Sequence, residues 1–336
     1  MSNLQKQFEK FHANIRLSDK DEKAKLQDKR ELLIKDLRRG LKRDAEENST
    51  PRLVFEHFNQ GSYAMHTGTK PYNNDYDIDV GLIFDNTQDD FDSPVDLKKK
   101  IRNALNANFR KIKIRRPCVT VTYYKDGEPD YHVDLAVYVK IDDEEHFEIA
   151  MGKEHSSEEN QEWQESDPKG LINKINNRLT GDERAQFKRV IRYLKRWRDK
   201  QFNNGGAPIS IALTCAAYHW FQPASFDGEL NDLRALYNLV DSMIDNFGFP
   251  SARLSVELPV IPGGDLLDKM TDKQMEVFNE KLEALKDALF DAKNETSDVD
   301  ACKALEKLFG DEFPVPDEDT EKQSAVAPVV VTGTSA

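Results

Sequence analysis

Two acidic side chains alternate with apolar ones in the segment YDIDVGLIF, residues 76–84. Successive side chains of a strand point to opposite faces, so Asp77 and Asp79 would share one face with their Cα atoms about 7 Å apart. The other face would be apolar: Ile78, Val80, Leu82 and Phe84. Like charges this close raise each other's pKa unless water or a cation neutralises them. The segment predicts either a magnesium site, since Mg²⁺ prefers oxygen ligands, or a solvated edge face.

A third acid, Asp134, lies in the otherwise apolar segment YHVDLAV, residues 131–137. Burying a lone carboxylate on a strand is costly unless a cation or another partner compensates. The cost disappears if this strand pairs beside Asp77 and Asp79, because three carboxylates can hold two metal ions about 3.5–4 Å apart. Asp134 is otherwise an isolated exposed acid. We interpret the three residues as the catalytic and metal-binding set, with two Mg²⁺ ions per site and Mn²⁺ as a substitute.

A Gly-Ser pair, Gly61 and Ser62, precedes Asp77 by about sixteen positions. Glycine lets a phosphate approach backbone N–H groups at a helix start, and the serine hydroxyl adds a donor. The pair is otherwise only a turn that ends a strand. Together with the three acids, it predicts a nucleotide-binding turn.

The composition is that of a chain that folds in a reducing cytoplasm. The 336 residues are 38% hydrophobic and 32% charged, and their three cysteines are far apart. No stretch approaches the roughly 20 apolar residues that span a bilayer, and the N-terminus lacks a signal-peptide core. The net charge of −13 argues against a dedicated binder of long nucleic acid. We therefore expect no membrane partner and no long nucleic-acid partner.

The order of the predicted elements indicates an α+β fold. A bracing helix is expected within residues 1–50, mainly from Ser18 to about Arg43. Residues 51–168 form the predicted mixed αβ core, with strands at 53–58, 77–84, 118–124, 131–139 and 147–151 and a helix at 94–109. Residues 169–316 form an all-helical part, with helices at 171–179, 182–200, 208–221, 229–247, 265–293 and 298–309. Residues 317–336 are expected to be a flexible tail.

These residues resemble a known signature. Gly61-Ser62, Asp77-Ile78-Asp79 and Asp134 are similar to the signature of the DNA polymerase β-like nucleotidyltransferase superfamily. Within it, the strings GSYAMHTGTKP, YDIDVGLIF and IRYLKRW resemble the bacterial cGAS/DncV-like nucleotidyltransferases of CBASS anti-phage operons. The resemblance covers roughly residues 55–309. It implies a bilobed enzyme, with a cleft between a nucleotidyltransferase core of mixed sheet and flanking helices and an all-helical lobe, braced by a long N-terminal helix.

The resemblance also implies substrates and further site residues. Lys195 matches a family lysine that contacts the triphosphate, with a solvated helix face as the alternative. Ser210 falls near a family Ser or Tyr position, with an unliganded helix start as the alternative. The implied reaction joins nucleoside triphosphates, ATP and GTP first, into a cyclic di- or oligonucleotide messenger. The same core allows three other interpretations: an RNA-tailing enzyme, an enzyme that nucleotidylates a protein or small molecule, and a non-catalytic nucleotide-binding scaffold.

The last residues carry a further expectation. After the acidic run DEDTEK, the chain ends in AVAPVVVTGTSA, which is small and apolar. A small terminal residue can enter a narrow channel of another protein, and some operons of the resembling family encode an E1/E2-like conjugating enzyme. Ala336 is therefore a candidate point of covalent attachment, and a tail without a role is the alternative.

Overall fold

The computed structural model describes residues 3–17, 20–72, 76–106, 110–125, 127–141, 146–203, 205–248 and 253–317. The chain folds into two compact units. The sheet unit comprises residues 16–180 and 256–266, and the helical unit comprises residues 1–15, 181–255 and those from 267 onward. The predicted tail after Asp317, with Ala336 as its attachment point, lies outside the described residues and stays a prediction.

These units divide the chain differently from the predicted domains. Helix α1 (Gln5–Ile15) belongs to the helical unit, whereas α2 (Lys20–Asn48) belongs to the sheet unit. The reason for this division is local, because Leu17 N donates to Gly68 O at 3.2 Å and ties the chain after α1 to the sheet unit. Residues 1–50 are therefore two helices in two units, and the expected bracing of both lobes by the longer one stays a prediction.

Two further segments that the sequence analysis assigned to the helical part belong to the sheet unit. They are α5 (Pro168–Asn177) and the connector 256–266. Asp167 N, just before α5, donates to Ile261 O of the connector at 3.1 Å. The two segments are thus held together within the sheet unit.

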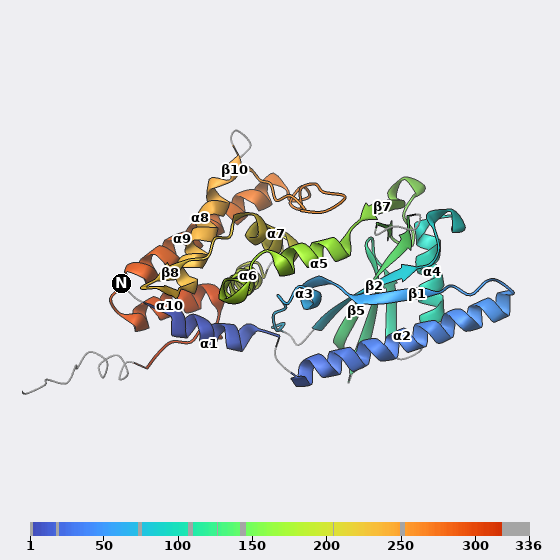
Figure 1. Ribbon diagram of the computed structural model, residues 1–336, viewed down its shortest axis with the longest axis horizontal. Helices are drawn as coiled ribbons and strands as arrows, with labels where there is room; N and C mark the ends of the chain where they lie inside the picture. Colours follow the sequence, from blue (N-terminus) through green and yellow to red (C-terminus); the bar gives the residue numbers. More distant parts are fainter. Residues whose placement is uncertain are drawn as a thin grey trace, which may run out of the picture. The chain divides into compact units, whose positions relative to one another are not determined.

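Seven strands of the described residues form one mixed sheet, as the predicted fold class requires (Figure 1). Five of them follow the order β1 (Phe55–Asn59), β2 (Tyr76–Phe84), β5 (Glu128–Lys140), β4 (Cys118–Lys125), β3 (Arg110–Ile114). Strands β6 (Phe147–Met151) and β7 (Glu162–Ser166) extend it from the later part of β5. Only the β2–β5 pair is parallel among these described strands.

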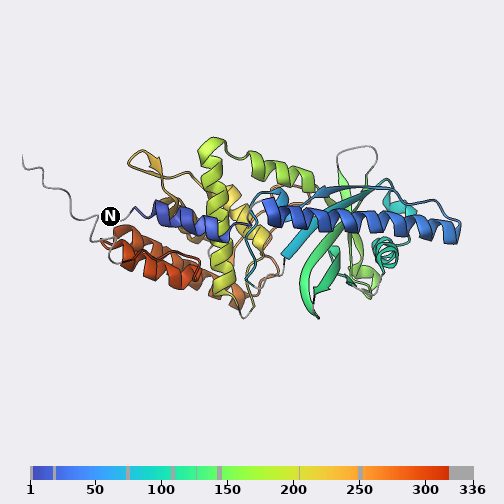
Figure 2. The same ribbon diagram turned by 90° about the horizontal axis from the view of Figure 1, so that it is seen from below.

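One face of this sheet carries the main core. The apolar residues of β2 and β5 that alternation assigns to one face are all buried: Ile78, Val80, Leu82, Phe84, Val133, Leu135 and Val137. They pack in one cluster with α2 and α4 (Pro94–Leu105), and α2 runs across the strands in Figure 2. A Cβ on Gly40 of α2 would lie 2.0 Å from the carbonyl oxygen of Ala104 of α4. Glycine therefore permits the close crossing of these two helices.

The opposite face holds the acids at one end and a small cluster beyond them. That cluster contains Ile83, Tyr138 and Phe147, with Phe58 packed against it. Lys169 of α5 places its Nζ 5.2 Å from the centre of the Phe147 ring. The apolar side chains on this face therefore form only a small cluster, which lies next to the row of acids.

The helical unit is built around aromatic side chains. Phe8 and Phe11 of α1 pack against Tyr193 of α6 (Gly181–Gln201) and against Phe309 of α10 (Asp298–Phe309). Tyr193 donates its hydroxyl to Phe8 O at 2.8 Å. The other helices of this unit among the described residues are α7 (Ser210–Trp220), α8 (Asp232–Asp245) and α9 (Asp272–Asn294). No helix of the described chain is long and apolar enough to cross a membrane.

Several predicted boundaries are wrong for identifiable reasons. Helix α9 begins at Asp272 and not at residue 265, because Thr271 and Gln274 form a capping box there. Helix α4 ends at Leu105, because Asn106 is extended. Strands β3 and β7 were not predicted. Nor were the two-residue strands of the helical unit: β8 (Ser225–Phe226), β9 (Glu229–Leu230), β10 (Phe247–Gly248) and β11 (Arg253–Leu254).

Candidate active site

The pairing of β2 with β5 brings the three predicted aspartates together. In this parallel register Asp79 is the partner of Asp134, and Asp77 is the partner of His132. Asp77, Asp79 and Asp134 each place a carboxylate oxygen within 4.8 Å of the other two. Asp77 is exposed, and the other two are half-buried. The sequence predicted that the three acids lie on one face of the sheet. The register of β2 and β5 shows that they also lie at the same end of that face.

The donor set fits a hard divalent cation. The Oδ1 atom of Asp134 is buried and accepts no hydrogen bond from the described residues. An unpaired buried carboxylate oxygen destabilises a fold by several kcal/mol in order of magnitude, so an external partner is called for. Three carboxylates that converge on one point offer the oxygen ligands that Mg²⁺ or Mn²⁺ takes.

The predicted Gly-Ser turn lies directly against one of these carboxylates. The short helix α3 (Gly61–Ala64) begins at Gly61, whose φ is +61°. A Cβ added to Gly61 would lie 1.8 Å from Oδ2 of Asp79. Just before it, Gln60 N donates to the backbone oxygen of Asp79 at 3.1 Å. A larger residue here would displace the Asp79 side chain, so glycine allows the turn to lie against this acid. The half-buried Ser62 is the next residue of the turn.

A buried tyrosine is hydrogen-bonded to the residue that precedes this turn. The hydroxyl of Tyr138 donates to Oε1 of Gln60 at 3.1 Å. Burial raises the pKa of Tyr138, and the nearby charge of Asp79 raises it further. The phenol therefore stays protonated and keeps donating to the residue that precedes Gly61.

A buried lysine anchors the chain that enters β4. Lys98 of α4 is fully buried, and its Nζ donates to the backbone oxygens of Arg115, Arg116 and Gly152 at 3.1, 2.6 and 2.9 Å. An ammonium group has three N–H donors, so all three are used here. The turn at residues 115–118 is thereby fixed to the end of β6.

This lysine predicts a pH dependence of stability. Burial lowers the pKa of Lys98 from 10.5 to about 8. Between these two values the unfolded chain binds the proton and the folded chain does not, so the free energy of unfolding rises with pH there, by at most about 3 kcal/mol. Below pH 8 both states are protonated and this gain is absent. Urea unfolding at pH 7.5, 8.5 and 9.5 should show that the free energy of unfolding of wild type rises with pH relative to that of Lys98→Met. If the two free energies change with pH in parallel, the lowered pKa of Lys98 is wrong. If the variant does not fold, NMR of wild-type protein labelled with ¹³C-lysine measures the pKa of Lys98 directly.

Lys195 and Ser210 belong to the helical unit. The side chain of Lys195 on α6 is only 4% exposed, so the alternative of a solvated helix face is wrong. Burial raises the pKa of the Cys215 thiol on α7 to about 12, and the charge of Lys195 opposes this rise. Ser210 is the first residue of α7, and its carbonyl accepts from Oγ1 of Thr214 at 3.2 Å. Their roles toward a nucleotide stay predictions.

Another buried cation on α6 was not predicted. Lys188 lies two turns before Lys195, and it is 7% exposed. Burial, followed by the charges of Arg192 and Arg184, lowers its pKa to about 7. The spacing of four, four and three residues from Arg184 to Lys195 is the signal that could have shown one basic helix face.

Two parts of the chain match models of cyclic GMP-AMP synthase domains. Residues 55–138, which include Gly61, Ser62 and the three aspartates, match the nucleotidyltransferase domain of the cyclic GMP-AMP synthase DncV-like family. Residues 184–323, which include Lys195 and Ser210, match the C-terminal domain of cyclic GMP-AMP synthase. Together the two matches cover well over half of the chain. The chain belongs to the cGAS/DncV-like nucleotidyltransferase family.

Relatives of this DncV-like chain agree with the family assignment. A cyclic GMP-AMP synthase of Escherichia albertii is 31% identical over 158 residues, which are 44% of this chain and 32% of that protein. The match thus spans about a third of the curated relative. The crystal structure of Vibrio cholerae DncV cyclic AMP-GMP synthase is 18% identical, with a TM-score of 0.73 over 93% of this chain and 97% of that chain. Its complex with the linear intermediate 5′ pppA(3′,5′)pG has a TM-score of 0.72, over 91% and 97%. These structures establish the polymerase β-like fold.

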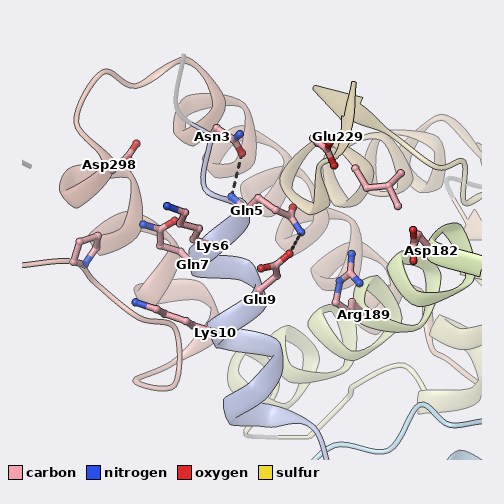
Figure 3. Close-up of a pocket in the computed structure, with 12 residues that line it drawn as sticks. Asn3, Gln5, Lys6, Gln7, Glu9, Lys10, Asp182, Arg189, Glu229 and Asp298 are labelled. Carbon is pink, nitrogen blue, oxygen red and sulfur yellow. Dashed lines mark hydrogen bonds between the residues drawn. The ribbon is translucent and has the colours of Figure 1, made fainter. Parts of the chain in front are cut away.

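The helical unit of this DncV-like chain also contains an open hollow of about 970 Å³ (Figure 3). Two of its charged side chains, Glu9 and Arg189, are hydrogen-bonded within the protein. Arg189 donates to both carboxylate oxygens of Asp232, at 2.6 and 2.8 Å, and Gln5 donates to Glu9 at 3.1 Å. Acids and bases both line it, so it indicates no class of ligand.

Proposed function

We propose that this chain is a divalent-metal-dependent nucleotidyltransferase that joins nucleoside triphosphates into a cyclic di- or oligonucleotide, with ATP and GTP as substrates. The observation that carries the proposal is the convergence of Asp77, Asp79 and Asp134 at one end of the β2–β5 pair. A scaffold that only binds nucleotide has no need of three carboxylates within 4.8 Å. The family assignment supports the same reaction class.

The three carboxylates would hold the metal, with Mg²⁺ as the natural ion and two ions per site. When bound, the metal lowers the pKa of the attacking hydroxyl and stabilises charge on the triphosphate. The acids themselves repel a triphosphate that arrives without a cation, so they make nucleotide binding depend on metal. Gly61 leaves room beside Asp79 for a phosphate to approach the backbone, and Ser62 adds a hydroxyl donor.

The choice of substrates is supported by what the relatives are called. The Escherichia albertii relative is named a cyclic GMP-AMP synthase, and Vibrio cholerae DncV has been solved with GTP bound. Transfer of those names to this chain is part of the proposal. The match of residues 184–323 to a cyclic GMP-AMP synthase C-terminal domain favours ring formation over tailing of RNA or modification of a protein.

One incubation tests the reaction. The protein is mixed with all four nucleoside triphosphates and Mg²⁺ or Mn²⁺, treated with phosphatase, and the products are identified by mass spectrometry. A cyclic product resistant to phosphatase supports the proposal, and an Asp77→Asn, Asp79→Asn preparation serves as the blank. Labelled nucleotide on added RNA or protein, with no ring in any mixture, would replace the proposal by the corresponding alternative.

We also propose, on the family resemblance, that the product is a messenger in anti-phage defence. Expression of the chain with its neighbouring genes should lower phage plaque counts. The double aspartate variant, expressed to the same level, should not. Equal protection by both would separate any defence role from nucleotide transfer.

A prediction for Lys195 follows from its charge and from the family position that it matches. Lys195→Ala should raise the KM for nucleotide about tenfold or more, because a charge-assisted hydrogen bond to phosphate contributes about 1.5–3 kcal/mol. Lys200→Ala, at an exposed position of the same helix, is the matched control and should leave KM unchanged. Steady-state kinetics over a range of ATP and GTP give both values. An unchanged KM and kcat in Lys195→Ala would leave the residue with a packing role only.

A further inference from the structure

Two rows of side chains cross the face of the sheet that bears the acids and end on the edge strand β3. Directly opposed residues of neighbouring strands carry their side chains on the same face. The first row of register partners is Asp79, Asp134, Thr120 and Lys113. The second row is Asp77, His132, Thr122 and Lys111. Each lysine therefore lies on the face of the acids, two strands or about 10 Å from β5.

The two lysines present their charges to solvent. Lys111 and Lys113 are exposed, whereas Ile114, which alternates with them, is buried in the main core on the other face. Neither lysine forms an ion pair with another residue in the part of the chain that the structure describes. Both ammonium groups are thus open to a ligand on the face of the acids.

A third cation lies on the strand between these lysines and the third acid. Arg115 follows β3, and its Nε donates to Oγ1 of Thr120, the register partner of Asp134, at 3.0 Å. A guanidinium has five N–H donors, and this bond uses one of them. The backbone of Arg115 is anchored, because its N donates to Cys118 O at 2.9 Å and its carbonyl accepts from Nζ of Lys98 at 3.1 Å. The exposed guanidinium is therefore held over β4.

The Gly-Ser turn lies on the other side of the acids. Gly61 follows β1, which pairs with β2 at the opposite end of the strand order from β3. In the proposed reaction this turn receives the phosphates of the nucleotide that is transferred. The other nucleotide supplies the hydroxyl and keeps its own triphosphate in the linear product. A ribose carries its hydroxyls and its 5′-phosphate on opposite faces of the ring, so a nucleotide that enters from the β4 side extends its phosphates away from the acids, toward β3.

We propose that Lys111, Lys113 and Arg115 bind the 5′-triphosphate of the nucleotide that supplies the attacking hydroxyl. The inference rests on the proposed function, since it assumes that the aspartates are the reaction centre. Ammonium and guanidinium groups form strong charge-assisted hydrogen bonds with phosphate oxygens, whereas the acids repel them. Lysines on an edge strand can instead serve only to prevent pairing with another sheet, and the test distinguishes the two roles.

The test separates the two nucleotides. Labelled 2′,3′-dideoxy-GTP donates its nucleotide but has no hydroxyl to accept one, so added ATP or AMP is the acceptor. Dideoxy-ATP with GTP or GMP tests the reverse order. Labelled dinucleotide formed with Mg²⁺ gives a KM for each substrate. Wild type should have a lower KM for the triphosphate acceptor than for the monophosphate. Lys111→Gln, Lys113→Gln should raise the KM for the triphosphate acceptor about tenfold or more, because charge-assisted contacts are lost.

The KM values for the monophosphate acceptor and for the donor should change far less, which a general loss of structure would not produce. Arg115→Gln should act in the same direction as the double lysine variant. Lys35→Gln, Lys42→Gln removes the same charge from exposed positions of α2 and is the matched control, with every KM as in wild type. Circular dichroism checks the fold of each variant.

The outcomes distinguish this inference from the proposed function. If the double lysine variant raises all KM values alike, or none, the lysines do not bind the phosphates of the acceptor. Equal KM values of wild type for the triphosphate and monophosphate acceptors would overturn the inference in the same way. If wild type forms neither a dinucleotide nor a ring from any mixture of triphosphates, the proposed function itself is wrong.

Discussion

The double variant Asp77→Asn, Asp79→Asn should lose nucleotide transfer by about 10³-fold or more, because it removes two of the three charges that hold the metal. The fold should survive, since the apolar partners of these residues on β2 stay in the core and Asn matches Asp in size. The melting temperature without metal should stay equal or rise, because repulsion among carboxylates within 4.8 Å is relieved. Product formation by mass spectrometry and thermal melting in EDTA give the two readouts.

An acid just beyond the end of the same strand serves as the control. Asp85 follows the far end of β2 and pairs with Lys140 at 2.6 Å on the exposed surface. Asp85→Asn should retain wild-type turnover. Asp134→Asn should be about as damaging as the double variant, and the triple variant should be no slower, because ligands of one site act as a unit. Near wild-type turnover in the Asp134 variant would move the third carboxylate elsewhere, with Asp130 the next candidate among the described residues.

The faces of the strands could be predicted from the sequence, because alternation has a fixed period of two. The apolar side chains at residues 78, 80, 82 and 84 are buried as expected. The distance between the acids could not be predicted from residues alone, since Asp79 and Asp134 are joined only by the register of two strands that are distant in the chain. The resemblance to a known family, and not the local pattern, indicated that these acids lie close together.

The missed strands show where local pattern fails. Strand β3 has the sequence RKIKI, which contains three basic residues and only two apolar ones. Strand β7, EWQES, is polar because it lies at the edge of the sheet, where β6 is its one partner among the described strands. Such strands are formed by their neighbours and carry little signal of their own.

Buried polar groups were missed for a related reason. Lysine and threonine are usually surface residues. The sequence does not show that Lys98 donates to three backbone carbonyls or that Thr120 accepts from a guanidinium. Their partners come from other elements and are set only once the sheet is assembled. The acids of the site were easier to predict, because an alternating pattern of Asp on an apolar strand has few structural uses.

The glycine at the start of α3 gives the second large expected effect. Gly61→Ala should lower turnover by about 100-fold or more, because displacement of a reacting group by about 1 Å has that effect. A Cβ at this position would lie 1.8 Å from Oδ2 and 2.5 Å from Cγ of Asp79, so the carboxylate has to leave its place. Mn²⁺ affinity should fall with turnover, which links the loss to the metal ligand.

Backbone strain alone has to be separated from this collision. Gly61 has a φ of +61°, which costs a residue with a Cβ about 1–2 kcal/mol. Gly181, at the start of α6, has a φ of +54° with no atom within 4 Å of its added Cβ. Gly181→Ala therefore carries the strain without the contact, and it should lower the melting temperature while leaving turnover and Mn²⁺ affinity of the folded protein unchanged. If both variants lose stability alike and neither loses turnover, the approach of Gly61 to Asp79 has no part in catalysis, and the Gly-Ser pair is only the turn that ends β1.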